Sequence, residues 1–84
     1  MKRHERLLRT VLNGQSDANI RFADLQSLLF HLGFSERIRG SHHLFEKEGV
    51  VEIVNPQVQS GMAKRYQVRQ VRQLILRYKL GGDC

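Results

Sequence analysis

The chain has 84 residues, 40% of them hydrophobic, which is enough for one small domain with one thin core and too little for two. Fourteen Lys and Arg against eight Asp and Glu give a formal charge of +6, which favours an anionic partner, nucleic acid before membrane, because no long amphipathic basic run adjoins a hydrophobic anchor. The single cysteine, Cys84, excludes an internal disulfide and a Cys-rich zinc site, and the charged N-terminus lacks a signal-length apolar stretch, so a cytoplasmic location is expected.

Two amphipathic helices are expected first. One runs from Lys2 to Asn13, and a polar connector over 15–20 leads to the second, from Phe22 to Leu32, which Gly33 ends. In both segments apolar residues recur at helical spacing, as on a face that packs against a core. His31, beside the apolar stripe of the second helix, is interpreted as structural or solvent-facing, because a cation near a helix C-terminus complements the helix dipole.

Three short β-rich runs follow, and tight breaks separate them. They are Phe34 to Arg39, His42 to Lys47 and Val50 to Val54, with breaks at Gly40-Ser41 and Glu48-Gly49. Such a succession predicts an antiparallel meander, which Asn55-Pro56 closes because proline cannot continue a strand ladder. We expect residues 57–63 to form a loop.

The last element is a basic helix from Tyr66 to Tyr78. Its apolar side faces the core, and on another side Arg65, Arg69 and Arg72 recur at helical spacing, with Lys64 just before them. Two interpretations stay open. These cations either contact nucleic-acid phosphates or form the solvated side of an amphipathic helix.

This order of elements predicts a two-layer α+β domain of the α-β-β-β-α kind over 1–84. It has a three-stranded antiparallel sheet, a core at 16–80 and an extra N-terminal helix within 1–15. Double-stranded-RNA-binding domains share that order and use basic side chains to follow phosphates across the grooves of RNA.

The adjacent pair His42 and His43 is the chemically distinctive feature of the chain. Neighbours in a strand point to opposite faces, so only one of them can belong to a given site, and the apolar residues that follow leave the choice open. Gly40 and Ser41 ahead of the pair allow close approach of a phosphate, to which the Ser41 hydroxyl can donate a hydrogen bond.

Imidazole suits proton transfer near neutral pH. An RNA 2′-hydroxyl beside a scissile phosphate needs a base to remove its proton and cations to hold the phosphate, and no metal or other cofactor is then required. The lack of a clustered set of carboxylates agrees with this. A purely structural role for both histidines is the competing interpretation.

Over about residues 16–80 the chain resembles the HicA family of bacterial toxins. The resemblance rests on the helix that runs into Gly33-Phe34, the stretch Gly40-Ser41-His42-His43-Leu44-Phe45, the hairpin, the strand before Pro56 and the closing basic helix. The resemblance implies a small messenger-RNA endonuclease with a double-stranded-RNA-binding-like fold, which acts without metal and is inhibited by a HicB-type antitoxin. It also implies that His42 is catalytic, with His43 in reserve because the family motif also occurs with its histidine one place later, and that Gly40 and Ser41 shape the site.

The leading hypothesis is therefore a toxin ribonuclease with RNA as substrate, an antitoxin as partner and no membrane association. The residues expected to bind RNA are Arg39, Lys64, Arg65, Arg69 and Arg72. A non-catalytic RNA-binding module is the alternative, and a helical DNA-binding protein is a third, weaker one because the strands do not resemble a helix-turn-helix.

Overall fold

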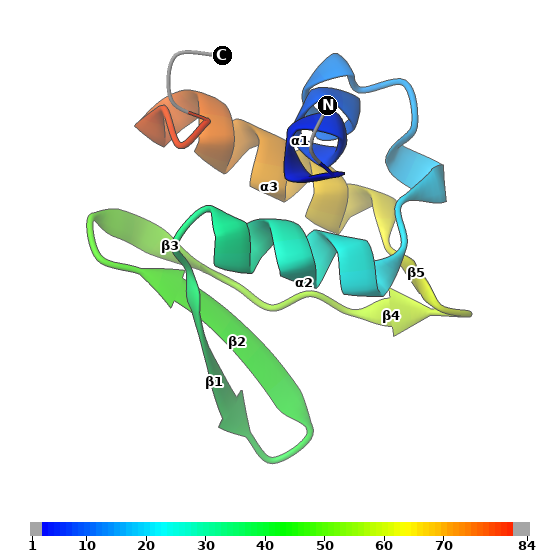
Figure 1. Ribbon diagram of the computed structural model, residues 1–84. Helices are drawn as coiled ribbons and strands as arrows, with labels where there is room; N and C mark the ends of the chain where they lie inside the picture. The colour runs from blue at the N-terminus through cyan, green and yellow to red at the C-terminus, as the bar shows by residue number, and fades with distance from the viewer. Residues whose placement is uncertain (1–2, 82–84) are drawn as a thin grey trace.

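The computed structural model describes residues 3–81, so Lys2, where the first predicted helix begins, and Cys84 lie outside the described residues. Two helices come first, then three strands, a two-strand hairpin and a last helix (Figure 1). The bounds are α1 (Arg3–Asn13), the 3-10 turn η1 (Asp17–Asn19), α2 (Phe22–His31), β1 (Ser35–Arg39), β2 (His42–Lys47), β3 (Val50–Val54), β4 (Val58–Gln59), β5 (Met62–Ala63) and α3 (Arg65–Tyr78). Within residues 3–81, the bounds predicted from the sequence for the long helices and the three main strands agree with the observed bounds within one residue.

Strands β1, β2 and β3 form an antiparallel sheet in chain order, as predicted. Phe45 of β2 and Val54 of β3 are partners in register, and both are fully buried. The Phe45 ring meets Phe30 of α2 edge-on, with ring centroids 5.1 Å apart. Glu52, on the same face of β3 as Val54, forms an ion pair with Arg77 of α3. Helices α2 and α3 therefore cover the same face of the sheet, and the predicted α+β class is confirmed.

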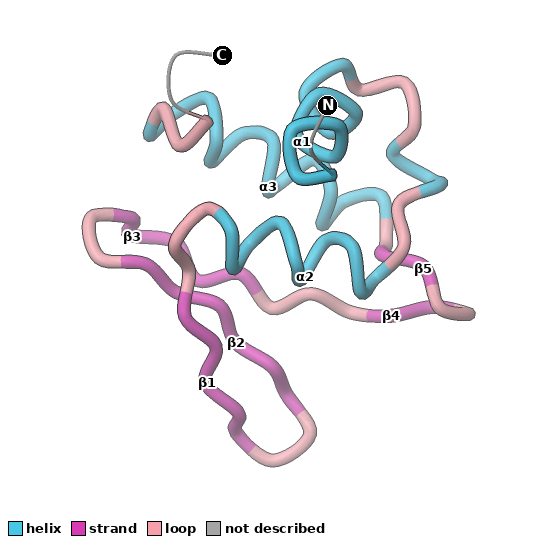
Figure 2. The backbone as a smooth tube through the Cα atoms, viewed as in Figure 1, coloured by secondary structure: helices cyan, strands magenta, loops and turns pink. Residues whose placement is uncertain are grey.

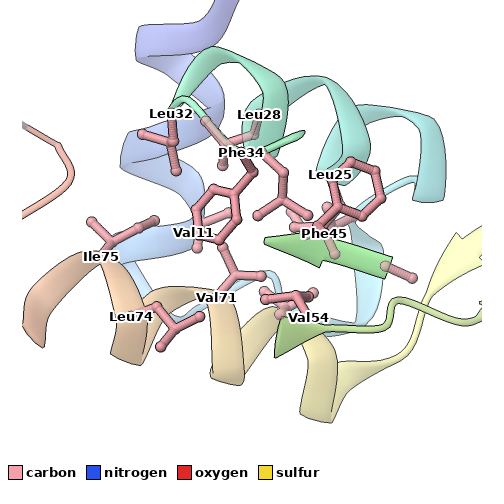
Figure 3. Packing of buried hydrophobic residues seen from close by; sticks show 14 of the residues in the cluster. Val11, Leu25, Leu28, Leu32, Phe34, Phe45, Val54, Val71, Leu74 and Ile75 are labelled. Atoms are coloured by element: carbon pink, nitrogen blue, oxygen red, sulfur yellow. The ribbon is translucent and has the colours of Figure 1, made fainter. Parts of the chain in front are cut away.

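One cluster of buried apolar side chains joins the helices to the sheet (Figure 3). Its members are Leu8, Val11, Ile20, Leu25, Leu28, Leu29, Leu32, Phe34, Phe45, Val54, Ala63, Val68, Val71, Leu74 and Ile75. Leu8 and Val11 come from α1, the helix that the sequence placed outside the 16–80 core. The N-terminal helix is thus part of the packed interior, because its apolar face is covered by α2 and α3.

The segment predicted as a loop at residues 57–63 instead contains the short hairpin β4–β5 (Figure 2). The hairpin attaches to the start of α2: the Ala63 amide donates to the Ile20 carbonyl at 2.9 Å, and the Phe22 amide donates to the Gly61 carbonyl at 3.1 Å. The loop prediction was wrong because the backbone groups of this segment find partners in the connector before α2, which no periodicity in the segment itself reveals.

Candidate active site

The hairpin of β1 and β2 carries the two histidines and extends beyond the helices (Figure 1). Its two-residue turn is Gly40-Ser41, since Arg39 and His42 are partners in register. Gly40 has a φ of 60°, and Ser41 is not among the residues of positive φ, as in a type II′ turn. The turn therefore fixes the register of the hairpin and places both histidines at the start of β2.

The register assigns the two histidines to opposite faces of the sheet. His43 pairs with Ile38 and shares its face with Phe45, the face that α2 and α3 cover. His42 pairs with Arg39 on the outer face and is exposed. The sequence left this choice open, and the hairpin pairing decides it in favour of His43 as the histidine on the helix-covered side.

His43 has an acidic partner that the sequence analysis did not name. Its Nδ1 lies 2.5 Å from Oε2 of Glu36 on β1. The side chains are only partly exposed, 42% for His43 and 23% for Glu36. When Nδ1–H donates to the carboxylate, the neutral ring keeps its lone pair on Nε2, which can then accept a proton. The pair is a carboxylate–imidazole dyad of the kind that orients a general base.

Next to the dyad lies a pocket of about 370 Å³. The turn and β2 line one side of it, the segment after β3 lines the other, and the first residue of α2 completes it. The lining residues are Phe22, Ser41, His42, His43, Asn55, Pro56, Gln57 and Val58. The pocket therefore gathers the predicted motif residues Ser41, His42 and His43, while Gly40 acts through the turn that carries them.

A polar bridge connects this pocket to the start of α3. Oε1 of Gln57 accepts hydrogen bonds from Nζ of Lys64 and from the hydroxyl of Tyr66, both at 3.2 Å. Lys64 is the N-cap residue of α3, and Tyr66 lies in its first turn. Of the basic residues predicted on this helix, Lys64 is thus the one joined to the histidine pocket. Arg39 is the strand partner of His42 and does not itself line the pocket.

Arg65 and Arg69 lie on a different side of α3. Both are exposed and line a second hollow of about 410 Å³, which faces the η1 region. Asp17 and Gly14 contribute to the same hollow. These two arginines therefore offer a cationic surface that is separate from the histidine pocket.

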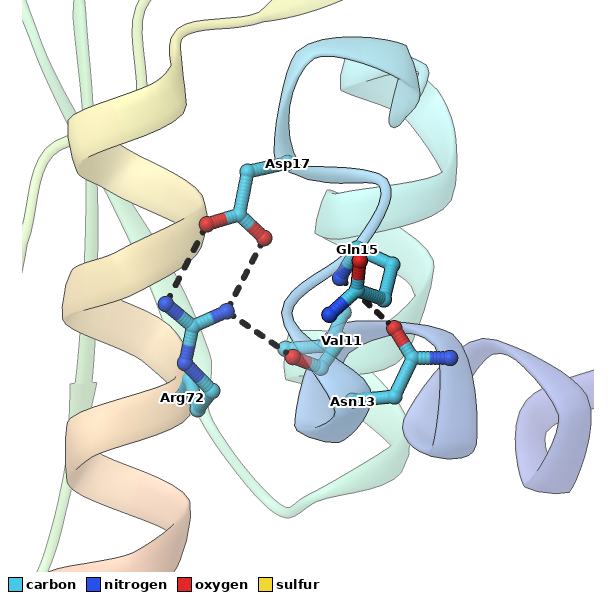
Figure 4. A network of polar contacts seen from close by, with 5 residues as sticks. All are labelled: Val11, Asn13, Gln15, Asp17 and Arg72. Carbon is cyan, nitrogen blue, oxygen red and sulfur yellow. Dashed lines mark hydrogen bonds and ion pairs between the residues drawn. The ribbon is translucent and has the colours of Figure 1, made fainter.

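Arg72 takes part in a network of intramolecular hydrogen bonds (Figure 4). Its two terminal nitrogens donate to the two carboxylate oxygens of Asp17 at 2.9 and 3.1 Å, and Nη1 also donates to the Val11 carbonyl at 3.1 Å. Only 20% of the Arg72 side chain and 15% of the Asp17 side chain are exposed. The guanidinium therefore joins α3 to α1 and η1, and the expected contact of Arg72 with RNA stays a prediction.

A larger hollow of about 490 Å³ lies between α1 and α2 and includes none of the predicted site residues. There the rings of His4 and His31 stack with centroids 4.3 Å apart, and Nε2 of His4 lies 2.8 Å from Oγ of Ser27. These contacts join α1 to α2, so a structural role is sufficient to explain the presence of His31.

Within residues 3–81, no group of three or more His, Cys, Asp and Glu side chains is arranged to hold a metal ion. None of the helices in that range has the length and apolar character needed to span a membrane. Comparisons with protein-family models, with curated proteins and with solved structures return no significant match.

Proposed function

We propose that the protein is an endoribonuclease that cleaves messenger RNA without metal and serves as the toxin of a type II toxin-antitoxin pair. The observation that carries the proposal is the Glu36–His43 dyad beside a pocket that Ser41 and His42 also line. The resemblance of residues 40–45 to the HicA motif supports messenger RNA as substrate, a HicB-type antitoxin as partner and a cytoplasmic location. The α-β-β-β-α order of the core supports a double-stranded-RNA-binding-like fold.

In the proposed reaction His43 is the general base. Its Nε2 takes the proton of the 2′-hydroxyl, O2′ attacks the adjacent phosphorus, and the bond from phosphorus to O5′ breaks, which leaves a 2′,3′-cyclic phosphate and a 5′-hydroxyl. The departing O5′ takes up a proton from water, so that the step balances. The resemblance implied His42 as the catalytic histidine with His43 in reserve, whereas the dyad favours His43 as the base.

Two cations adjoin residues that line this pocket. Arg39 is the strand partner of His42, and Lys64 reaches the pocket through Gln57. Such side chains hold the RNA backbone and stabilise the negative charge that develops on the phosphate. Arg65 and Arg69 form a separate cationic surface on α3, where they would bind further phosphates.

The test is to incubate the purified protein with a long single-stranded RNA in excess EDTA and to compare variants on one gel. His43→Ala should lose about 10²- to 10⁴-fold in cleavage rate, the usual contribution of a general base. Glu36→Gln should lose roughly 10- to 150-fold, the equivalent of one charge-assisted hydrogen bond. The matched control is His31→Ala, which removes an exposed histidine outside the pocket and should cleave like the wild type.

Several results would contradict parts of this proposal. A 5′-phosphate product would exclude attack by the 2′-hydroxyl. Loss of cleavage in His42→Ala with full activity in His43→Ala would restore the base role to His42. RNA left intact by the wild type, together with tight RNA binding, would favour the alternative of a non-catalytic RNA-binding module, which the exposed pair Arg65 and Arg69 could serve equally well.

A further inference from the structure

The segment between β3 and β4 brings Gln57 to the histidine pocket. Pro56 is buried, and Gln57 follows it as an exposed residue whose side chain lines the pocket with His43. A proline has a fixed φ, so a buried one restricts where the next residue can point. The position of Gln57 is therefore determined by the packing of this segment.

The amide of Gln57 is also held in one orientation. A lysine ammonium can only donate hydrogen bonds, so the atom that faces Nζ of Lys64 is the amide oxygen, and the Tyr66 hydroxyl donates to the same oxygen. The amide nitrogen is left with two N–H groups, for which residues 3–81 provide no partner. Gln57 thus presents fixed donors beside the pocket.

Tyr66 adds an aromatic ring to the same cluster. Its residue is 48% exposed, and its hydroxyl is fixed by Gln57 at the first turn of α3. An aromatic ring that is held in place and open to solvent gives a platform on which a nucleobase can stack, as in other proteins that bind single-stranded RNA. Lys64 supplies the positive charge next to this ring.

We infer that Gln57, Lys64 and Tyr66 form a nucleotide subsite beside the His43 pocket. The base of a single-stranded RNA nucleotide adjacent to the scissile phosphate stacks on Tyr66. The amide N–H of Gln57 donates to an acceptor on the edge of that base and so selects it, and Lys64 binds the phosphate. The inference rests on the proposed function, because it names the part of the RNA that this site recognises.

The experiment measures binding of short single-stranded RNAs, varied among the four bases at one position, to proteins that all carry His43→Ala so that the RNA stays intact. Tyr66→Ala should weaken binding about 5- to 150-fold, the range for loss of one stacked base. Tyr66→Phe keeps the ring and should bind nearly as tightly, but with a weaker base preference because the Gln57 amide is no longer held by the hydroxyl. Gln57→Ala should reduce the base preference by about fivefold, the equivalent of one hydrogen bond.

Gln73→Ala and Tyr78→Phe are the matched controls, since Gln73 is an exposed residue of α3 and the Tyr78 hydroxyl bonds to Glu52, away from the pocket. Both should bind RNA like the parent. Tyr66→Leu guards against a folding defect, because it keeps apolar packing, and it should weaken binding as Tyr66→Ala does.

The outcomes separate the inference from the proposed function. Unchanged affinity in Tyr66→Ala and Tyr66→Leu, or an unchanged base preference in Gln57→Ala, would overturn the subsite even if the wild type cleaves RNA. Weaker binding in the Tyr66 variants and a lost preference in Gln57→Ala would support the subsite even if the wild type leaves RNA intact, in which case only the nuclease proposal fails.

Discussion

The ion pair of Arg72 and Asp17 offers the sharpest test of the structure, because the sequence assigned this arginine to RNA. In Arg72→Ala, three hydrogen bonds are lost, two of them to a carboxylate that is only 15% exposed. Removing one partner of a fully buried pair costs about 3–5 kcal/mol. Some water reaches this pair, so we expect about 2–3 kcal/mol of lost unfolding free energy.

The assay is urea unfolding followed by circular dichroism, with thermal melts alongside. A loss of that size corresponds to a fall of roughly 8–24 °C in Tm for a domain of this length. Asp17→Ala and the double variant complete a cycle, and the coupling energy should be about 1–3 kcal/mol. Arg69→Ala is the matched control, because Arg69 is an exposed arginine on the same helix. We expect this variant to change the free energy of unfolding by less than about 0.5 kcal/mol.

For RNA affinity we expect the opposite result: Arg69→Ala has the larger effect and Arg72→Ala the smaller. Arg69→Ala should weaken binding and lower its salt dependence, since each phosphate contact releases counterions. Arg72→Ala should bind normally at temperatures where it is folded. A stability change below about 0.5 kcal/mol in Arg72→Ala with no coupling to Asp17, or equal losses of RNA affinity in both variants, would refute this reasoning.

Three further predictions concern stability. The pKa of Glu52 lies below its ordinary value of 4.5, chiefly because the Tyr78 hydroxyl donates a hydrogen bond to the carboxylate, with weaker effects that include the charge of Arg77. The ionised carboxylate therefore stabilises the fold above pH 4.5, and this stabilisation is lost as the pH falls through the lowered pKa. Tyr78→Phe should therefore make unfolding free energy less dependent on pH in acid, and an unchanged pH profile would contradict the assignment. Gly40→Ala should cost about 1–2 kcal/mol in chemical unfolding, because a residue with a Cβ is strained at a φ of 60°, although the added Cβ would meet no atom within 4 Å outside the two neighbouring residues. A neutral result would show that the turn relaxes. Phe45→Ala removes a fully buried ring and should cost about 3–5 kcal/mol, enough to leave much of the chain unfolded by circular dichroism, and a well-folded variant would contradict the packing.

The long elements could be predicted because their residues repeat with the period of the structure they form. Helical spacing in α2 and α3 and the glycine-marked turns of the sheet were sufficient to find them within a residue. The hairpin β4–β5 was missed because two-residue strands carry no period, and the contacts that stabilise it come from the distant Ile20 and Phe22.

The residues of the candidate site likewise fall into those that the sequence predicted and those that it did not. The motif residues were found because Gly40 and Ser41 precede two adjacent histidines, but Glu36 was missed although a signal existed. A two-residue turn pairs Arg39 with His42, which places residue 36 diagonally opposite His43 on the same face. The role of Arg72 could not be predicted, since it depends on how η1 packs against α3.

The projecting hairpin has a consequence for hydrogen exchange. The tip residues Arg39, Gly40, Ser41 and His42 are exposed, whereas Phe45 further along β2 is fully buried. Local opening costs least where few apolar contacts must break, so the tip frays without unfolding of the core. The proposed dyad then stands at the boundary between a fraying end and a protected interior. A bound RNA or protein that spans both strands would slow amide exchange at the tip and leave the exchange of core amides governed by global unfolding.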